Sequence, residues 1–310
     1  MEKIIVSSGG TYTDPDALGS AIAYAELLRL QGNDAYAVLP GPLNHAITDM
    51  VRALQPQFLT TPPAGEAAYV LVDISNPDWV EKFVDLDKVI AVLDHHHGFE
   101  SYWKERIGNQ AKIEMIGAAA TLVWEAWVAS GHAHRISPSS ANLLMIAIVS
   151  NSLNFKVAIT SERDHAAFRE LQKHGTLRAG WVEQYLQEVE SALANDLENL
   201  LPHDTKTETI PQLEKPVLIS QIELYDGKRF LDTYQERLLA FLRQQSTPYT
   251  FADLPSMGEE CTYFVAENPR VQELLAQHFH VHFENSIARY PTIILRKMIL
   301  KKLLEEQLLP

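Results

Sequence analysis

The stretch Val89-Ile90-Ala91-Val92-Leu93-Asp94-His95-His96-His97 joins five apolar residues directly to one carboxylate and three imidazoles. Five apolar residues in a row are typical of a buried strand, and open α/β sheets build their sites at the C-terminal ends of such strands. A carboxylate followed by imidazoles is an uncommon way to end a buried strand unless the side chains hold a metal or an anion. Residues 94–97 are therefore expected at a functional site.

Similar apolar runs at residues 4–6, 35–39 and 69–72 alternate with amphipathic stretches at residues 17–30, 118–129 and 137–150. Apolar strands alternating with helices predict an α/β fold, a parallel sheet with helices on both faces. Further helices are predicted at residues 163–174 and 181–200.

The composition changes after Leu201, where a polar segment precedes predicted strands at residues 217–222 and 262–266. Helices are expected at residues 229–243 and 295–307. Together with the length of 310 residues, this predicts two domains, residues 1–185 and a smaller α+β domain of residues 186–310.

The net charge of −14 argues against binding of long nucleic acids or of anionic membranes, because no general basic surface is available. It leaves room for a small anionic substrate held by local cations. The single cysteine, Cys261, excludes an intrachain disulfide, and the longest apolar run, residues 143–149, is too short to span a membrane. Glu2 and Lys3 lead straight into a strand-like run without a signal peptide, so a cytoplasmic protein is expected.

Carboxylates also follow two other predicted strands. Asp14 and Asp16 flank Pro15, and Asp73 follows residues 69–72. Carboxylates this close repel each other unless a cation neutralises them, and hard ions such as Mg²⁺ and Mn²⁺ prefer oxygen ligands. The alternatives are that Asp14 or Asp16 caps the following helix and that Asp73 is a turn residue.

The imidazoles of residues 95–97 favour Mn²⁺, Co²⁺ or Zn²⁺ over Mg²⁺. A second histidine beside a ligand can donate a hydrogen bond to a phosphate. The alternative is a chance cluster in a solvated loop. His278, His280 and His282, spaced two apart, predict a polar strand face in the smaller domain rather than a site.

Lys206, Arg296 and Lys297 are candidate phosphate-binding residues, although each could be an ordinary surface charge. The chain has no phosphate-binding glycine loop, no dinucleotide fingerprint and no nucleophile elbow.

The order of these motifs resembles the DHH phosphoesterases, and most closely the manganese-dependent (family II) inorganic pyrophosphatases and related exopolyphosphatases. The matching pieces run along nearly the whole chain: Met1-Glu2-Lys3-Ile4-Ile5, Asp14-Pro15-Asp16-Ala17, Leu71-Val72-Asp73, Leu93-Asp94-His95-His96, Ile148-Val149-Ser150-Asn151-Ser152, Asp204-Thr205-Lys206, Ile219-Ser220-Gln221-Ile222-Glu223 and Arg296-Lys297.

The resemblance implies a DHH domain, a DHH-associated C-terminal domain and an active site in the cleft between them. It implies metal ligation by Asp14, Asp16, Asp73, His95 and Asn151, with Asp73 as the bridge, and phosphate binding by His96, Lys206, Arg296 and Lys297. The nucleophile would be a water activated by the ion, for which Mn²⁺ is favoured and Mg²⁺ or Co²⁺ are alternatives. The expected substrate is pyrophosphate, polyphosphate or a related small phosphorylated anion. A homodimer is an open expectation.

Two positions depart from the family pattern. The family has a histidine about four residues before Asp14, where this chain has Gly9 or Gly10, and an aspartate where this chain has Asn151. An amide oxygen can still ligate a hard ion but brings no charge, so weaker metal binding is expected. The alternative function is therefore a degenerate relative, weakly active or inactive, that binds a phosphorylated ligand or a protein partner. A nuclease-like relative is disfavoured because the C-terminal segment lacks the Gly-Gly-Gly-His signature of that branch.

Overall fold

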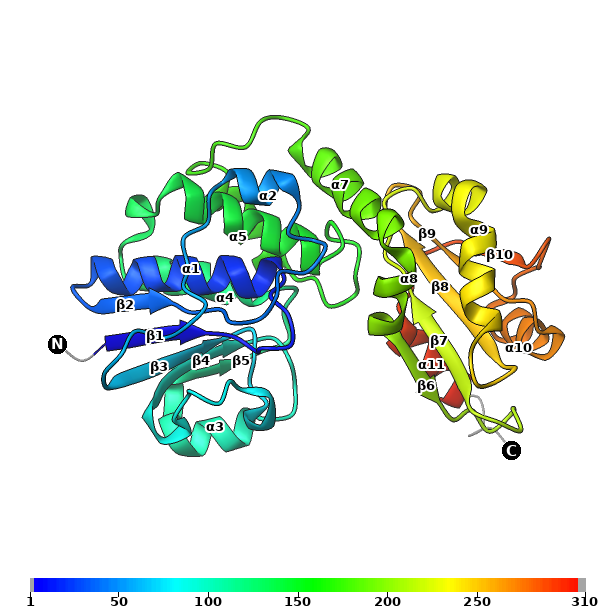
Figure 1. Cartoon of the computed structure of the whole chain (residues 1–310). Coiled ribbons are helices and arrows are strands. Elements are labelled where there is room, and N and C mark those ends of the chain that lie inside the picture. Colours follow the sequence, from blue (N-terminus) through cyan, green and yellow to red (C-terminus); the bar gives the residue numbers. More distant parts are fainter. Residues whose placement is uncertain (1–2, 306–310) are drawn as a thin grey trace. The chain divides into compact units, whose positions relative to one another are not determined.

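The computed structural model describes residues 3–305, which divide into two compact units, Met1–Glu188 and Val189–Pro310 (Figure 1). Each unit has its own five-stranded sheet. The division falls within helix α7 (Trp181–Asn195). Among the described residues, no helix is both long enough and apolar enough to cross a lipid bilayer.

The sheet of the first unit is entirely parallel, in the order β2-β1-β3-β4-β5. The strands are β1 (Lys3–Ser7), β2 (Asp34–Ala37), β3 (Ala67–Val72), β4 (Val89–Asp94) and β5 (Ala111–Ile113). The chain adds β2 on one side of β1 and β3 on the other, so the topology switches direction between β1 and β3. The C-terminal ends of strands at such a switch point are where open α/β sheets bind ligands.

Helices cover both faces of this sheet, as the sequence predicts. Helices α1 (Pro15–Leu30), α4 (Ala119–Ala129) and α5 (Pro138–Asn151) lie on one face, and α3 (Glu100–Ile107) lies on the other (Figure 1). The helices on each side contribute a fully buried tryptophan, Trp127 of α4 and Trp103 of α3. Each donates its indole N–H to a backbone carbonyl. The unit is completed by α2 (Asp49–Ala53) and α6 (Glu162–Leu171).

The second unit has a mixed sheet in the order β10-β9-β8-β7-β6. Its strands are β6 (Thr205–Glu208), β7 (Val217–Gln221), β8 (Thr250–Ser256), β9 (Cys261–Val265) and β10 (Ile287–Tyr290). One apolar core contains residues of α9 (Gly227–Arg243) and of the short helix α8 (Leu197–Leu200). The other contains residues of α10 (Pro269–Phe279) and α11 (Arg296–Glu305), so helices pack on both sides of this sheet too.

Two predictions beyond residue 180 need correction, one for a strand that does not form and one for a helix that is interrupted. The strand expected around His278, His280 and His282 does not form, because α10 continues to Phe279 and His280 ends it in the left-handed conformation. His278 is buried on that helix, with its Nδ1 2.8 Å from the carbonyl oxygen of Leu274. The helix predicted over residues 181–200 is interrupted at Asp196. The predicted end of the last helix, residues 306 and 307, lies outside the described residues.

Candidate metal centre

The predicted acidic strand ends of the first unit do converge. Asp73 follows β3 directly, Asp94 ends β4, and Asp14 precedes α1 in the connection from β1. Asp14 and Asp16 are the two largest charge contributions that raise the pKa of Asp73, after burial itself. Asp14, Asp16, Asp73 and Asp94 therefore share one region at the C-terminal edge of the parallel sheet.

Asp73 is, with Asp94, one of two of these carboxylates that have a buried oxygen without a hydrogen-bond partner. Its side chain is 8% exposed, and its Oδ1 has no hydrogen-bond partner although it lies 3.4 Å from His95 Nε2. Burial, followed by the charges of Asp14 and Asp16, raises its pKa well above the ordinary value. A buried carboxylate oxygen without a donor costs free energy unless a proton or a cation fills its place. This orphaned atom is what a metal ion would satisfy.

His95 presents an electron pair to the same place. Its Nδ1 lies 3.1 Å from the carbonyl oxygen of Ile116, which can only accept, so Nδ1 carries the proton. In the neutral form of such a ring the lone pair is on Nε2, the nitrogen that faces Asp73. A lone pair and a carboxylate oxygen pointing at each other repel, and a cation between them would reverse the sign of the interaction.

Asp94 orients the next histidine. Its Oδ1 accepts the backbone N–H groups of His95 and His96 and also His96 Nδ1, at 2.8, 3.2 and 2.8 Å. The hydrogen bond to Asp94 raises the pKa of His96 and leaves Nε2 of this exposed ring for another partner. His97 instead pairs with Glu100 at 2.9 Å, so the histidine run divides into two site residues and one surface residue.

In the described part of the chain, one group of side chains has potential metal-ligating atoms close enough together to share an ion. Asp73, His95 and His96 each offer a ligand atom, and these atoms lie within 4.8 Å of one another. Carboxylate oxygen and imidazole nitrogen together suit Mn²⁺, Co²⁺ or Zn²⁺. The residues present therefore fit a divalent metal ion.

Asp14 has the structural role considered as an alternative. It is the N-cap of α1, and its Oδ1 accepts the backbone N–H of Ala17 at 2.9 Å. Burial and the neighbouring charge of Asp16 raise its pKa. One oxygen is engaged by the helix, and the capping bond does not use the other.

Asp16 and Asn151 lie against each other, although 135 residues separate them. Asn151 donates its side-chain N–H to Asp16 Oδ2 at 2.7 Å, and the same nitrogen lies 3.4 Å from His95 Nε2. The structure thus brings Asn151 to the predicted site, with its amide nitrogen rather than its oxygen toward Asp16 and His95.

Gly10 faces a carboxylate. A Cβ atom placed on this residue would lie 1.3 Å from Glu81 Oε1. The space that a larger side chain at position 10 would need is therefore taken by Glu81, from the connection between β3 and β4.

Of the predicted phosphate-binding residues, His96 belongs to the first unit, and Lys206, Arg296 and Lys297 belong to the second. Lys206 on β6 and Lys297 on α11 are exposed, whereas Arg296 is 8% exposed and forms an ion pair with Asp204. Gln221 Oε1 accepts the backbone N–H of Arg296 at 2.7 Å.

Two further acidic residues that the sequence analysis did not single out as site residues lie in the same unit. Asp253 on β8 is fully buried, and neither carboxylate oxygen has a hydrogen-bond partner. Burial, then the charge of Asp204, raises the pKa of Glu223 to about 7. Both carboxyls lie near Arg296. Its positive charge opposes the effect of burial and lowers the pKa of each carboxyl.

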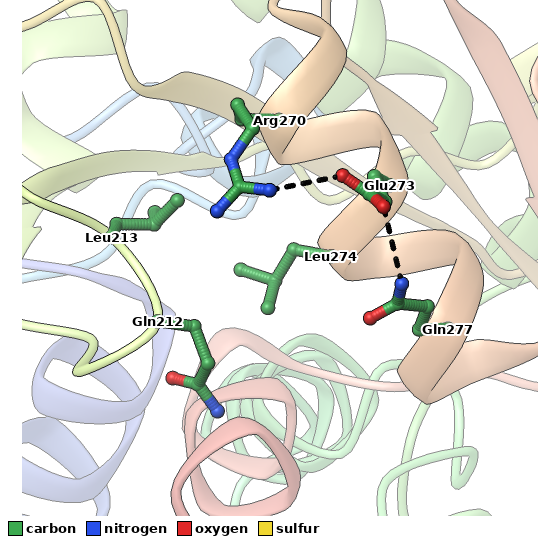
Figure 2. A pocket seen from close by; sticks show the side chains of 6 residues that line it. All are labelled: Gln212, Leu213, Arg270, Glu273, Leu274 and Gln277. Carbon is green, nitrogen blue, oxygen red and sulfur yellow. Dashed lines mark hydrogen bonds and ion pairs between the residues drawn. The ribbon is translucent and has the colours of Figure 1, made fainter.

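A small hollow of about 80 Å³ elsewhere in the second unit contains none of these residues (Figure 2). Its charged groups are already satisfied, because Arg270 and Gln277 both contact Glu273. We assign it no role.

Comparison with known proteins points to one family. Residues 3–148 match the N-terminal domain of the DHH family. A protein of Exiguobacterium sp. named probable manganese-dependent inorganic pyrophosphatase is 26% identical over 96% of both chains, and one of the same name from Staphylococcus carnosus is 26% identical over 92% of both. A Bacillus cereus protein of that name is 32% identical, but the match spans only about half of each chain.

Solved structures agree on the fold. A Methanococcus jannaschii protein assigned to the family II inorganic pyrophosphatases aligns over 97% of this chain and 98% of its own, with a TM-score of 0.61 and 21% identity. An exopolyphosphatase-related protein of Bacteroides fragilis aligns over 99% of this chain and 91% of its own, with a TM-score of 0.51 and 13% identity. Residues 3–148 thus match the DHH-family N-terminal domain, and the chain as a whole is similar to the family II inorganic pyrophosphatases.

Proposed function

We propose that this chain is a divalent-metal-dependent hydrolase of phosphoanhydride bonds, acting on pyrophosphate, polyphosphate or a related small anion. The observation that carries the proposal is the unpartnered Asp73 Oδ1 facing the lone pair of His95 Nε2 at 3.4 Å. The names of the full-length relatives support the same substrate class.

Asp73 and His95 would hold the ion, with Asp14 and His96 beside them, and Mn²⁺ is the favoured ion with Co²⁺ or Mg²⁺ as alternatives. Such an ion, when bound, lowers the pKa of a water molecule and offsets the charge of a phosphate. Asp94 keeps the Nδ1 proton of His96 in place, so Nε2 would donate to a phosphate oxygen when the ring is protonated.

Lys206, Arg296 and Lys297 would stabilise the negative charge of the substrate. The three cations differ in how freely they can contact a phosphate. Lys206 and Lys297 are exposed, but Arg296 must share its guanidinium with Asp204. We therefore expect the two lysines to make the more adaptable phosphate contacts.

The test is phosphate release by the purified chain from pyrophosphate, tripolyphosphate and longer polyphosphate, each with Mn²⁺, Co²⁺ or Mg²⁺. Metal-dependent turnover on at least one substrate is expected, and a chelator should abolish it. A protein that binds Mn²⁺ but releases no phosphate from any of these substrates would refute the proposal.

The second candidate is a relative that binds a phosphorylated ligand or a protein partner without hydrolysing it, and Gly10 and Asn151 favour it. Under that hypothesis, Gly10→His with Asn151→Asp would create activity that the native chain lacks. The end of the flexible Glu81 side chain lies in the space at position 10 and would have to shift to admit the histidine, so the same pair is also tested with Glu81→Ala. Brisk turnover by the native chain would eliminate this candidate.

A further inference from the structure

The Asp16 carboxylate has no vacant acceptor position. Its Oδ1 accepts from Ser20 Oγ and the backbone N–H of Ala120, at 3.1 and 2.8 Å. Its Oδ2 accepts from the backbone N–H of Ala119 and from Asn151 Nδ2, at 2.8 and 2.7 Å. An ionised carboxylate offers about four acceptor positions, and here four donors occupy them. Asp16 is also fully buried.

Two of those donors give Asp16 a structural role. Ala118 is the N-cap residue of α4 and has no side chain able to cap it, so the first N–H groups of this helix need an acceptor from elsewhere. Asp16 supplies it from α1, 103 residues away from Ala119. The carboxylate also lies at the positive end of the α4 dipole, which stabilises its charge.

The orientation of the Asn151 amide follows from its neighbours. Asp16 Oδ2 can only accept, and the hydrogen bond from His95 Nδ1 to the carbonyl of Ile116 places the lone pair of a neutral imidazole on Nε2. An amide oxygen placed there would face two acceptors, whereas the amide nitrogen donates to both. The N–H groups of Asn151 therefore lie between a carboxylate and an imidazole, at a place where a cation would otherwise join them.

We infer that the Asn151 amide takes the place of one cation, so that this chain binds a single divalent ion, on the Asp73 side of His95. The inference rests on the proposed metal-dependent function and specifies its stoichiometry. Asn151 is then a determinant of metal number rather than a ligand. Replacing its N–H by a carboxylate oxygen would set two anions against each other and generate a place for a second ion.

The experiment is metal counting with Mn²⁺ alone, by titration calorimetry and by elemental analysis after removal of free ion. We expect one Mn²⁺ per chain for the native protein and two for Asn151→Asp. The matched control is Asn109→Asp, which adds the same charge at an exposed position of the same unit and should still bind one. Circular dichroism checks that each variant is folded.

The outcomes separate the two proposals. Two ions on the native chain, or one ion on folded Asn151→Asp, would overturn the inference and leave the metal-dependent function intact. No bound ion on the native chain would overturn both. If Asn151→Asp fails to fold, the count on the native chain still decides, and anomalous scattering from a Mn²⁺-soaked crystal provides a second count.

Discussion

At the scale of single residues, Asp73 combines an unusual backbone conformation with an unpartnered buried oxygen. The chain holds this residue in the left-handed region, with φ of 56°, and buries a carboxylate oxygen that nothing hydrogen-bonds. Such strain persists only where the surrounding structure enforces it, and it clusters at functional positions. A residue of this kind destabilises the metal-free protein and serves the protein only when something binds.

Asp73→Asn should therefore have opposite effects on the two states. Without metal, loss of a buried charge near Asp14 and Asp16 should raise the free energy of unfolding by about 1 kcal/mol. With Mn²⁺, loss of an anionic ligand should weaken binding about 100-fold or more and remove hydrolysis. Urea unfolding in chelator and in Mn²⁺ measures both. Lower stability of the variant in chelator would contradict this account.

Glu223 provides a separate pH prediction in the second unit. Its folded pKa of about 7 lies above the ordinary 4.5, so the folded state holds the proton more tightly than the unfolded state. Stability from this group is full below pH 4.5 and is lost as the pH rises through 7, by up to about 3 kcal/mol.

Glu223→Gln should flatten that loss while keeping the acceptor for Gln221 Nε2, which donates to Glu223 Oε1 at 3.0 Å. Unfolding free energies at pH 5 and pH 8 measure the effect. An unchanged difference between the two pH values would show that Glu223 is not the group responsible.

At the scale of elements, the start of α4 is fixed by carboxylates from distant helices. Asp16 reaches it from α1, and Asp164 reaches it from α6, where it accepts from Gly117 N and Thr121 Oγ1 at 3.1 and 2.6 Å. Asp164 also accepts from the backbone and side chain of Ser161, closing a capping box on its own helix. This buried residue therefore links α6 to the start of α4.

Asp164→Ala should lower the free energy of unfolding by about 3 kcal/mol, because it leaves several buried donors without an acceptor. Glu162→Ala removes an exposed carboxylate two residues earlier on the same helix; it is the control and should change the free energy of unfolding by less than about 0.5 kcal/mol. Thermal or urea unfolding compares them. Equal effects of the two substitutions would refute the linking role.

The elements that the sequence predicted best are those whose burial is written in a local pattern. The apolar runs of β1, β3 and β4 and the helical spacing of α1, α4 and α5 were correct in type and close in extent. β8 was missed because Asp253 and Pro255 resemble loop residues, yet both lie in a buried strand. α10 was missed because its last turn carries histidines spaced as on a strand.

The same distinction holds for the site. Position alone placed Asp14, Asp73 and His95 at neighbouring strand ends. The donors that fill Asp16, the proton on His95 Nδ1 and the way Asn151 points depend on Ala119, Ala120 and Ile116, whose backbone groups carry no sequence signature. Asp94 belongs to the sequence motif, but no sequence pattern indicates that it orients His96.

At the scale of the whole molecule, the proposed chemistry divides between the units. The candidate metal ligands belong to the first and the candidate phosphate-binding cations to the second, although the chain carries a net charge of −14. Local cations matter more in so acidic a protein, because the general field repels an anionic substrate. Metal binding and substrate binding should therefore respond to different substitutions.

Lys206→Ala and Lys297→Ala should each leave the affinity for Mn²⁺ unchanged and raise KM for pyrophosphate or polyphosphate about tenfold, the loss of roughly one charge-assisted contact. Lys215→Ala, which removes an exposed lysine of the same unit, is the matched control and should change neither quantity. Steady-state kinetics and Mn²⁺ titration of the three variants give the comparison. If Lys206→Ala and Lys297→Ala behave like the control, the second unit does not supply the phosphate contacts. If they weaken Mn²⁺ binding instead, the division of roles between the units is wrong, because only substitutions in the first unit should change the affinity for Mn²⁺.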